Sequence, residues 1–171
     1  GSESVTHSAV LYPVFFFAIT VIAFFFFVRE VFVESLGRRN SSIVALIASL
    51  FLTIIPVLLP RTIAGIPEKE SAAFFFMFAT FYFFLKAWKS QKNLSRYIYA
   101  LLAGVFTGGM ALVWGGSAFI FITIGPAFFL SFLLGKVDKL KLSIYGTWMV
   151  SSFFLMYPFS TRYSIRNLLT S

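Results

Sequence analysis

The chain has 171 residues, of which 59% are hydrophobic and only 12% are charged, and its net charge is +8. A soluble domain of this size leaves much of its surface in water, so this composition excludes a soluble fold and places the chain in a bilayer. The basic residues lie between apolar runs, with no basic groove interleaved with aromatic residues, and we expect no nucleic-acid partner. The absence of cysteine excludes disulfides, thiolate metal sites and a cysteine nucleophile.

Six apolar segments are predicted to be membrane-spanning helices, because a hydrocarbon core about 30 Å thick requires roughly 20 helical residues. The Phe-rich runs also suit strands, but in lipid a helix satisfies its backbone groups within one segment. The predicted spans are 9–28, 43–59, 72–87, 97–113, 117–134 and 142–157. The sequence therefore predicts an all-α membrane protein in which residues 1–171 form a single domain, a six-span helical bundle.

The distribution of basic residues predicts the sidedness of the loops. Ten lie in one alternating set of loops and four in the other, and the positive-inside rule places the richer set in the cytoplasm. The N-terminus and the loop that carries Glu68 and Glu70 are then outside or lumenal. A further span upstream of Gly1 would account for an outer N-terminus. The ten cytoplasmic residues are Arg29, Arg38, Arg39, Lys86, Lys89, Lys92, Arg96, Lys136, Lys139 and Lys141.

The segment 61–70, Arg-Thr-Ile-Ala-Gly-Ile-Pro-Glu-Lys-Glu, carries two of the six acidic residues in a loop between apolar runs. Carboxylate oxygens are the ligands that Mg²⁺ and Mn²⁺ prefer, so Glu68 and Glu70 are candidate metal ligands. In an extended loop, residues two apart point the same way and can share a cation, whereas in a helix they diverge. The structural alternative is that Pro67 starts a helix whose dipole these carboxylates complement.

Three arginines on the predicted outer side are candidate contacts for a phosphorylated lipid. Arg61 ends the second span and either extends to the membrane interface or faces a lipid phosphate or a glutamate. Arg162 and Arg166 are four residues apart, with plain surface exposure as their alternative. No Ser-His-Asp set, phosphate-binding loop or paired-His motif is present, and the near absence of ionisable groups within the spans argues against a transporter core.

Two segments carry a family resemblance. Residues 59–70, with Arg-Thr-x-Ala-Gly before an acid-x-acid triplet, and residues 111–116, Ala-Leu-Val-Trp-Gly-Gly, resemble the catalytic subunit of oligosaccharyltransferase, especially its archaeal members. The resemblance implies that the six spans are the second to seventh of a thirteen-span C-type glycosyltransferase (GT-C) fold. Further similar positions extend it over nearly the whole chain, at 12–13, 81–82, 86–87 and 158–159.

The resemblance implies transfer of an oligosaccharide from a lipid-linked phosphate or pyrophosphate donor to the Asn of an Asn-x-Ser/Thr sequon, with Mn²⁺ or Mg²⁺ neutralising the leaving phosphate. By position, Glu68 and Glu70 match the family's second acidic motif, although Asp is common where Glu68 stands. The family's other catalytic acids and its WWDYG domain are expected upstream of Gly1 and beyond Ser171, so this segment alone is expected to be inactive.

The resemblance also predicts the location of the protein, with the archaeal cell membrane expected and the endoplasmic reticulum membrane as the alternative. Two other functional readings remain open at this point. One is a different polyprenyl-phosphate-sugar-dependent transferase, such as a protein O-mannosyltransferase. The other is a membrane subunit or transporter core without catalytic activity.

Overall fold

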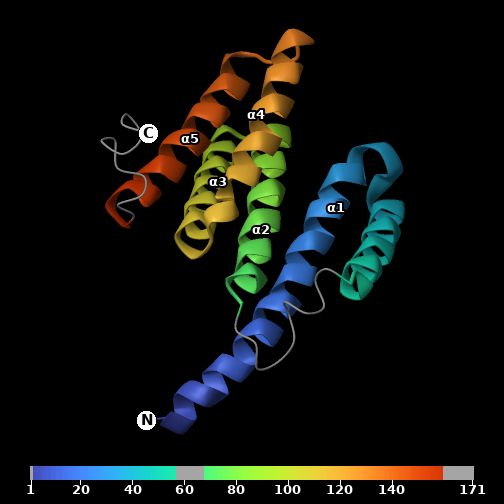
Figure 1. Cartoon of the computed structure of the whole chain (residues 1–171). Coiled ribbons are helices and arrows are strands. Elements are labelled where there is room, and N and C mark those ends of the chain that lie inside the picture. Colours follow the sequence, from blue (N-terminus) through green and yellow to red (C-terminus); the bar gives the residue numbers. More distant parts are fainter. Residues whose placement is uncertain (1, 57–67, 160–171) are drawn as a thin grey trace. The chain divides into compact units, whose positions relative to one another are not determined.

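The computed structural model describes residues 2–56 and 68–159, and all regular secondary structure in these ranges is helical (Figure 1). Four helical stretches are long and apolar enough to cross a membrane, namely Val10–Ile54, Lys69–Lys89, Asn93–Val113 and Gly115–Leu133. The expectation of an all-helical membrane protein is thereby confirmed, while the count of six spans and the single domain stay predictions. The helices are α1 (Ser2–Ile54), α2 (Lys69–Lys89), α3 (Asn93–Val113), the 3₁₀ turn η2 (Gly115–Ser117), α4 (Ala118–Leu133) and α5 (Lys139–Phe159).

Helix α1 is two helical arms joined at Gly37. The apolar stretch Val10–Ile54 has 45 residues, far more than one crossing needs. At Gly37 the backbone takes φ 73° and ψ 172°, a conformation that is essentially restricted to glycine. The chain reverses there, and Figure 1 shows the second arm returning beside the first. The first two predicted spans fall in these two arms, except for residues 57–59, which lie outside the described part of the chain.

The chain divides into two compact units, residues 1–82 and 83–171, each of which is described by itself. In the first unit, aromatic rings join the first arm of α1 to α2. The rings of Phe16 and Phe75 lie 6.3 Å apart. Further along both helices, those of Phe27 and Phe81 lie 5.6 Å apart. The later residue of α1 contacts the later residue of α2, so the two helices run parallel. Helix α2 therefore begins beside the end of this arm that is remote from Gly37.

In the second unit, α3 and α5 pack against each other through small residues. A Cβ atom added at Gly104 would lie 2.8 Å from the carbonyl oxygen of Trp148, and one added at Gly108 would lie 2.8 Å from the side chain of Leu155. Neither position therefore has room for a larger side chain at the present spacing of the two helices. The approach buries the Trp148 ring completely, and its indole N–H donates to the hydroxyl of Thr107 at 2.9 Å.

The end of α2, the start of α3 and the start of α5 meet at one end of the second unit. The Lys141 ammonium lies 5.1 Å from the centroid of the Trp88 ring, and the Tyr97 and Ser143 hydroxyl groups are 3.0 Å apart. The buried Arg96 donates from Nε and Nη2 to the carbonyl oxygen of Ser90, at 3.2 and 2.7 Å, which ties the α2–α3 turn together. Two of the lysine-rich segments thus share one end of this unit.

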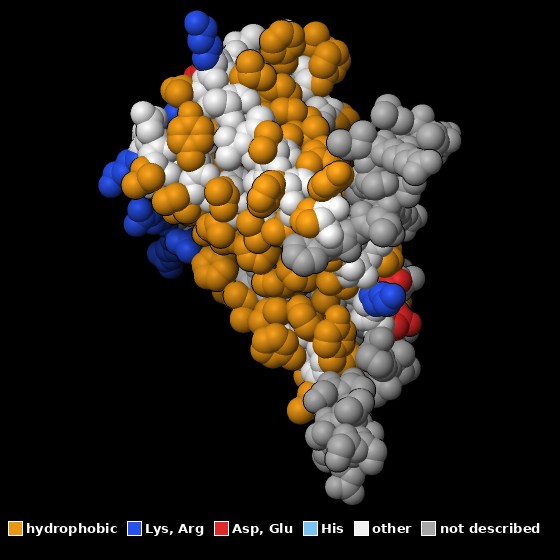
Figure 2. Space-filling model, turned by 90° about the vertical axis from the view of Figure 1, so that its left-hand side faces the viewer, with side chains coloured by type: hydrophobic (Ala, Val, Ile, Leu, Met, Phe, Trp, Pro, Cys, Tyr) orange, Lys and Arg blue, Asp and Glu red, His pale blue; other side chains and the backbone are white. Residues whose placement is uncertain are grey.

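Large hydrophobic side chains remain exposed along the helices. Leu50, Val150 and Phe154 are 67%, 70% and 78% exposed. Figure 2 shows hydrophobic side chains spread over much of the visible face, with most of the visible Lys and Arg side chains near its left edge. Such a surface is unstable in water and is solvated by lipid, which agrees with a membrane-spanning protein.

Candidate functional site

The acidic pair lies where the chain enters α2. Glu68 immediately precedes the helix, Lys69 begins it, and Glu70 lies in its first turn. Both glutamates are half-buried and Lys69 is exposed. The two carboxylates therefore belong to a residue outside the helix and a residue within it, so neither the fully extended nor the fully helical alternative describes the pair. Glu70 stands where a negative charge is stabilised by the helix dipole, as the structural alternative requires.

Ser71 fixes the backbone of Glu68. Its amide donates to the Glu68 carbonyl oxygen at 3.3 Å, and its hydroxyl donates to the same oxygen at 2.8 Å. The first amides of a helix have no acceptor within the helix. Because the Glu68 carbonyl oxygen accepts from the amide and the hydroxyl of Ser71, these two bonds stabilise the first turn of α2. The backbone of Glu68 is thus held at the start of α2 by hydrogen bonds, and the acidic pair does not lie in an unsupported loop.

Helix α1 holds Ser71 from the opposite side. The Thr20 hydroxyl lies 2.6 Å from the carbonyl oxygen of Phe16 and 3.5 Å from that of Ser71. The sequence contained no signal for Thr20. For Ser71 the sequence offered one local indication, a hydroxyl residue three positions after Glu68. That pattern could not identify the residue on α1 that Ser71 contacts.

The donor set suits a cation shared with a phosphate better than one enclosed by protein. Among residues 2–56 and 68–159, no group of three or more His, Cys, Asp or Glu side chains is placed to bind a metal. Mg²⁺ characteristically uses one or two carboxylates, keeps several waters and takes further oxygens from substrate phosphates. Glu68 and Glu70, half-buried and two positions apart in the chain, fit this mode of binding. The predicted site residues Arg61, Arg162 and Arg166 lie outside the described residues.

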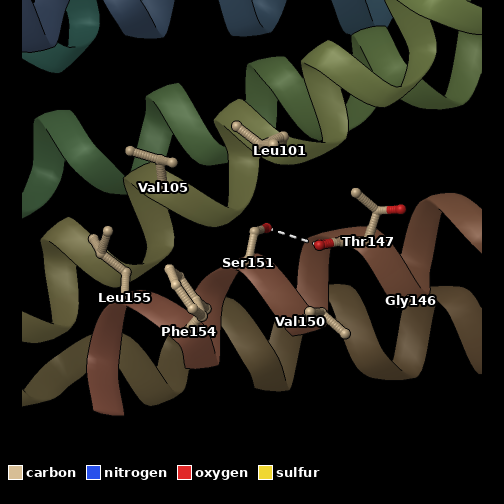
Figure 3. Close-up of a pocket in the computed structure, with 8 residues that line it drawn as sticks. All are labelled: Leu101, Val105, Gly146, Thr147, Val150, Ser151, Phe154 and Leu155. Carbon is tan, nitrogen blue, oxygen red and sulfur yellow. Dashed lines mark hydrogen bonds between the residues drawn. The ribbon is translucent and has the colours of Figure 1, made fainter. Parts of the chain in front are cut away.

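A surface groove between α3 and α5 is not a second candidate for chemistry. Its volume is about 740 Å³, and Figure 3 shows the residues that line it. Two of them are hydroxyl residues: Thr147 donates to the carbonyl oxygen of Ser143 at 2.9 Å, and Ser151 donates to that of Thr147 at 2.7 Å. Both hydroxyl protons are used within α5, and the remaining lining is mostly aliphatic and aromatic. The groove is therefore an apolar surface without a nucleophile or a charged ligand.

Comparison with known proteins identifies the family. The family model "Oligosaccharyl transferase STT3, N-terminal" matches residues 3–166. The chain is 31% identical over 139 residues to the dolichyl-diphosphooligosaccharide–protein glycosyltransferase subunit STT3 of Saccharomyces cerevisiae, covering 81% of this chain and 18% of the yeast protein. It is 30% identical over 135 residues to the dolichyl-diphosphooligosaccharide–protein glycosyltransferase subunit STT3B of Arabidopsis thaliana, covering 79% of this chain and 17% of the plant protein. The chain thus spans about a fifth of the length of these relatives. With nearly its whole length matched, Glu68 and Glu70 included, the chain belongs to the oligosaccharyl transferase STT3 family.

Proposed function

We propose that this chain is part of the membrane domain of an oligosaccharyltransferase catalytic subunit. The complete protein moves an oligosaccharide from a lipid-linked phosphate donor to the Asn of an Asn-x-Ser/Thr sequon in an acceptor polypeptide. Family membership and the names of the yeast and plant relatives support this activity. In this proposal the helices form six spans of a GT-C domain, in a multi-pass membrane protein whose Glu68–Glu70 segment faces outward or into the lumen. The archaeal assignment stays a prediction.

The observation that carries the proposal is the acidic pair at the start of α2. Glu68 and Glu70 bind Mn²⁺ or Mg²⁺ together with the phosphate of the donor, and the bound cation supplies positive charge where the leaving phosphate becomes more negative. The residues of the chain have two tasks here: the carboxylates bind the cation, and the Ser71 bonds hold the backbone between loop and helix. Arg61, Arg162 and Arg166 are proposed to contact donor phosphates through charge-assisted hydrogen bonds.

Glu68→Gln in the full-length enzyme tests this role. The amide keeps the size of the side chain but removes the negative charge, so we expect transfer to a sequon peptide at limiting Mn²⁺ to fall about 100-fold, the scale of losing one electrostatic contact in a transition state. The matched control is Glu34→Gln, the same change at an exposed residue of α1. It should leave transfer unchanged.

The acceptor separates the proposed activity from its nearest rival. We expect transfer to peptides with an Asn-x-Ser/Thr sequon and none to Ser/Thr peptides that lack Asn, which a protein O-mannosyltransferase would modify. Equal transfer by Glu68→Gln and the wild type at limiting Mn²⁺ would refute the metal role of Glu68. Absence of transfer to any Asn peptide by the wild-type enzyme would refute the activity itself.

A further inference from the structure

Basic residues gather at one end of the second unit. The segments 86–96 and 136–141 carry seven basic residues and one acidic residue, Asp138, which is also the only acidic residue in the sequence from 83 to 171. The Asp138 carboxylate accepts from the backbone amide of Lys141 at 2.7 Å, in the first turn of α5. One carboxylate, already engaged with the backbone, thus faces seven positive charges within this unit.

Lys141 joins the two basic segments. Its ammonium lies 5.1 Å from the centroid of the Trp88 ring, where the face of the ring attracts a cation, and it donates to the carbonyl oxygen of Lys136 at 2.7 Å. The positive-inside rule explains why loops on one side are basic, but it requires no contact between one loop and another. These contacts therefore hold the charges of the two segments together beyond what orientation in the membrane demands.

Exposed apolar side chains lie next to exposed lysines at this end. Lys92, Lys136 and Lys139 are exposed. Leu94, two positions after Lys92, is 75% exposed, and Leu134, two positions before Lys136, is 61% exposed. A soluble acidic partner would neutralise the lysines and leave these leucines in water, whereas a lipid covers them with its acyl chains and offers its headgroup to the lysines.

The turn of α1 at Gly37 differs in its charge balance, although its arginines are predicted on the same side of the membrane. Residues 29–39 carry three arginines and two glutamates. Neighbouring carboxylates weaken the attraction of that turn for an anion. The chain thus contains a second basic segment of low net charge, which serves as an internal reference for the basic end of the second unit.

We propose that this basic end binds the headgroup of an anionic phospholipid in the adjacent leaflet, which is the cytoplasmic one in the predicted topology. The exposed ammonium groups of Lys92, Lys136 and Lys139 attract the headgroup, as basic residues beside a membrane do. Trp88 lies at the same end, as tryptophans at a membrane interface do. The acyl chains of the lipid cover the adjacent leucines. This inference is independent of the proposed metal role of Glu68 and Glu70.

The test counts bound lipid rather than turnover. The purified full-length protein in a neutral detergent is titrated with phosphatidylglycerol or with phosphatidylcholine, and bound lipid is measured by native mass spectrometry. We expect the wild type to bind phosphatidylglycerol at least tenfold more tightly than phosphatidylcholine. Lys136→Gln combined with Lys139→Gln should raise the Kd for phosphatidylglycerol about tenfold and leave that for phosphatidylcholine unchanged, because only the anionic headgroup is attracted by these charges.

Two further variants separate a lipid site from damage to the fold and from loss of charge in general. Lys136→Arg combined with Lys139→Arg keeps both charges and should bind phosphatidylglycerol as the wild type does. The matched control, Arg38→Gln combined with Arg39→Gln, also removes two charges from exposed positions, but in the turn of α1. It should change the Kd less than twofold.

The outcomes that would overturn the proposal are distinct. An unchanged Kd for phosphatidylglycerol in the Lys136→Gln, Lys139→Gln variant excludes these lysines from lipid binding. An equal loss in the arginine control shows attraction by net charge alone, without a site. Displacement of phosphatidylglycerol by an equal concentration of free glycerol phosphate shows a site for a soluble anion instead of a lipid. Transfer to a sequon peptide is measured separately, so none of these results bears on the proposed function.

Discussion

At the scale of single residues, most buried polar side chains in the described part of the chain find a partner nearby, as lipid requires, whereas the buried Ser49 hydroxyl has none. Most Ser and Thr hydroxyls donate to a carbonyl one turn back, for example Thr107 to Ala103 at 2.8 Å. Trp148 cannot do this, because its indole N–H points away from its own helix and needs an acceptor from α3. The Trp148–Thr107 bond is therefore a specific polar contact in an otherwise apolar interface.

We expect Thr107→Val to lower the apparent melting temperature of the detergent-solubilised protein by several degrees. The indole N–H is left buried without an acceptor, which costs about 1–3 kcal/mol, and 1 kcal/mol corresponds to about 2–4 °C for a domain of this size. Thr123→Val is the matched control, since Thr123 makes the same one-turn bond at 2.7 Å but is exposed. The interpretation fails if Thr107→Val is as costly in a Trp148→Phe background as in the wild type.

At the scale of helices, two glycines have different physical roles. Gly37 permits the reversal of α1, because its positive φ is strained for any other residue. Gly104 has ordinary helical geometry, and a glycine is needed there because α5 lies too close for a Cβ atom. The Trp148 carbonyl belongs to the backbone of α5 and cannot rotate away from an added Cβ. Loss of Gly37 would thus act on one turn, whereas loss of Gly104 acts on the spacing of two helices.

Alanine at two helical glycines should have opposite effects on stability. Gly104→Ala forces α3 away from α5, and we expect a loss of about 1–3 kcal/mol, the usual range for overpacking. Gly146→Ala places its methyl group where nothing lies within 4 Å, so the better helix propensity of alanine should leave stability unchanged or raise it by up to about 1 kcal/mol. Thermal unfolding in one detergent measures both, and equal losses would contradict the packing argument.

At the scale of the whole molecule, α2 separates the acidic pair from a basic end. Glu70 lies in its first turn and Lys86 and Lys89 in its last. A helix of 21 residues is about 30 Å long, the thickness of the hydrocarbon core. Opposite charges at its two ends are therefore expected on opposite sides of the membrane, with the carboxylates away from the cytoplasm.

Cysteine labelling tests this sidedness, and the absence of native cysteine from this segment leaves it without a background signal. In sealed cells, a membrane-impermeant maleimide should label Lys69→Cys at once, but Asn40→Cys and Gln91→Cys only after permeabilisation. All three residues are exposed. Asn40 and Gln91 carry no charge, so these changes leave the positive-inside signal intact. Labelling of Lys69→Cys and Gln91→Cys from the same side would contradict a membrane-spanning α2.

The sequence alone determined the class of the molecule and the approximate positions of its helices, and it singled out the acidic pair that is proposed as its site. The physical reason is local: in lipid, each apolar segment must satisfy its backbone within itself, so length and hydropathy predict a helix. The acidic pair was recognisable from a short segment, and the family resemblance found in residues 59–70 is confirmed by the match over residues 3–166. Helix ends were less predictable, since α2 begins at Lys69 rather than at residue 72.

Only the tertiary structure decided what supports the site. Thr20 and Ser71 are separated by 51 positions in the chain, and no local pattern relates them. Their meeting depends on the parallel pairing of α1 with α2, which is fixed by the interlocking Phe rings between the two helices. Many Phe residues make several registers plausible from sequence, whereas the structure has one, in which Phe16 lies against Phe75 and Phe27 against Phe81.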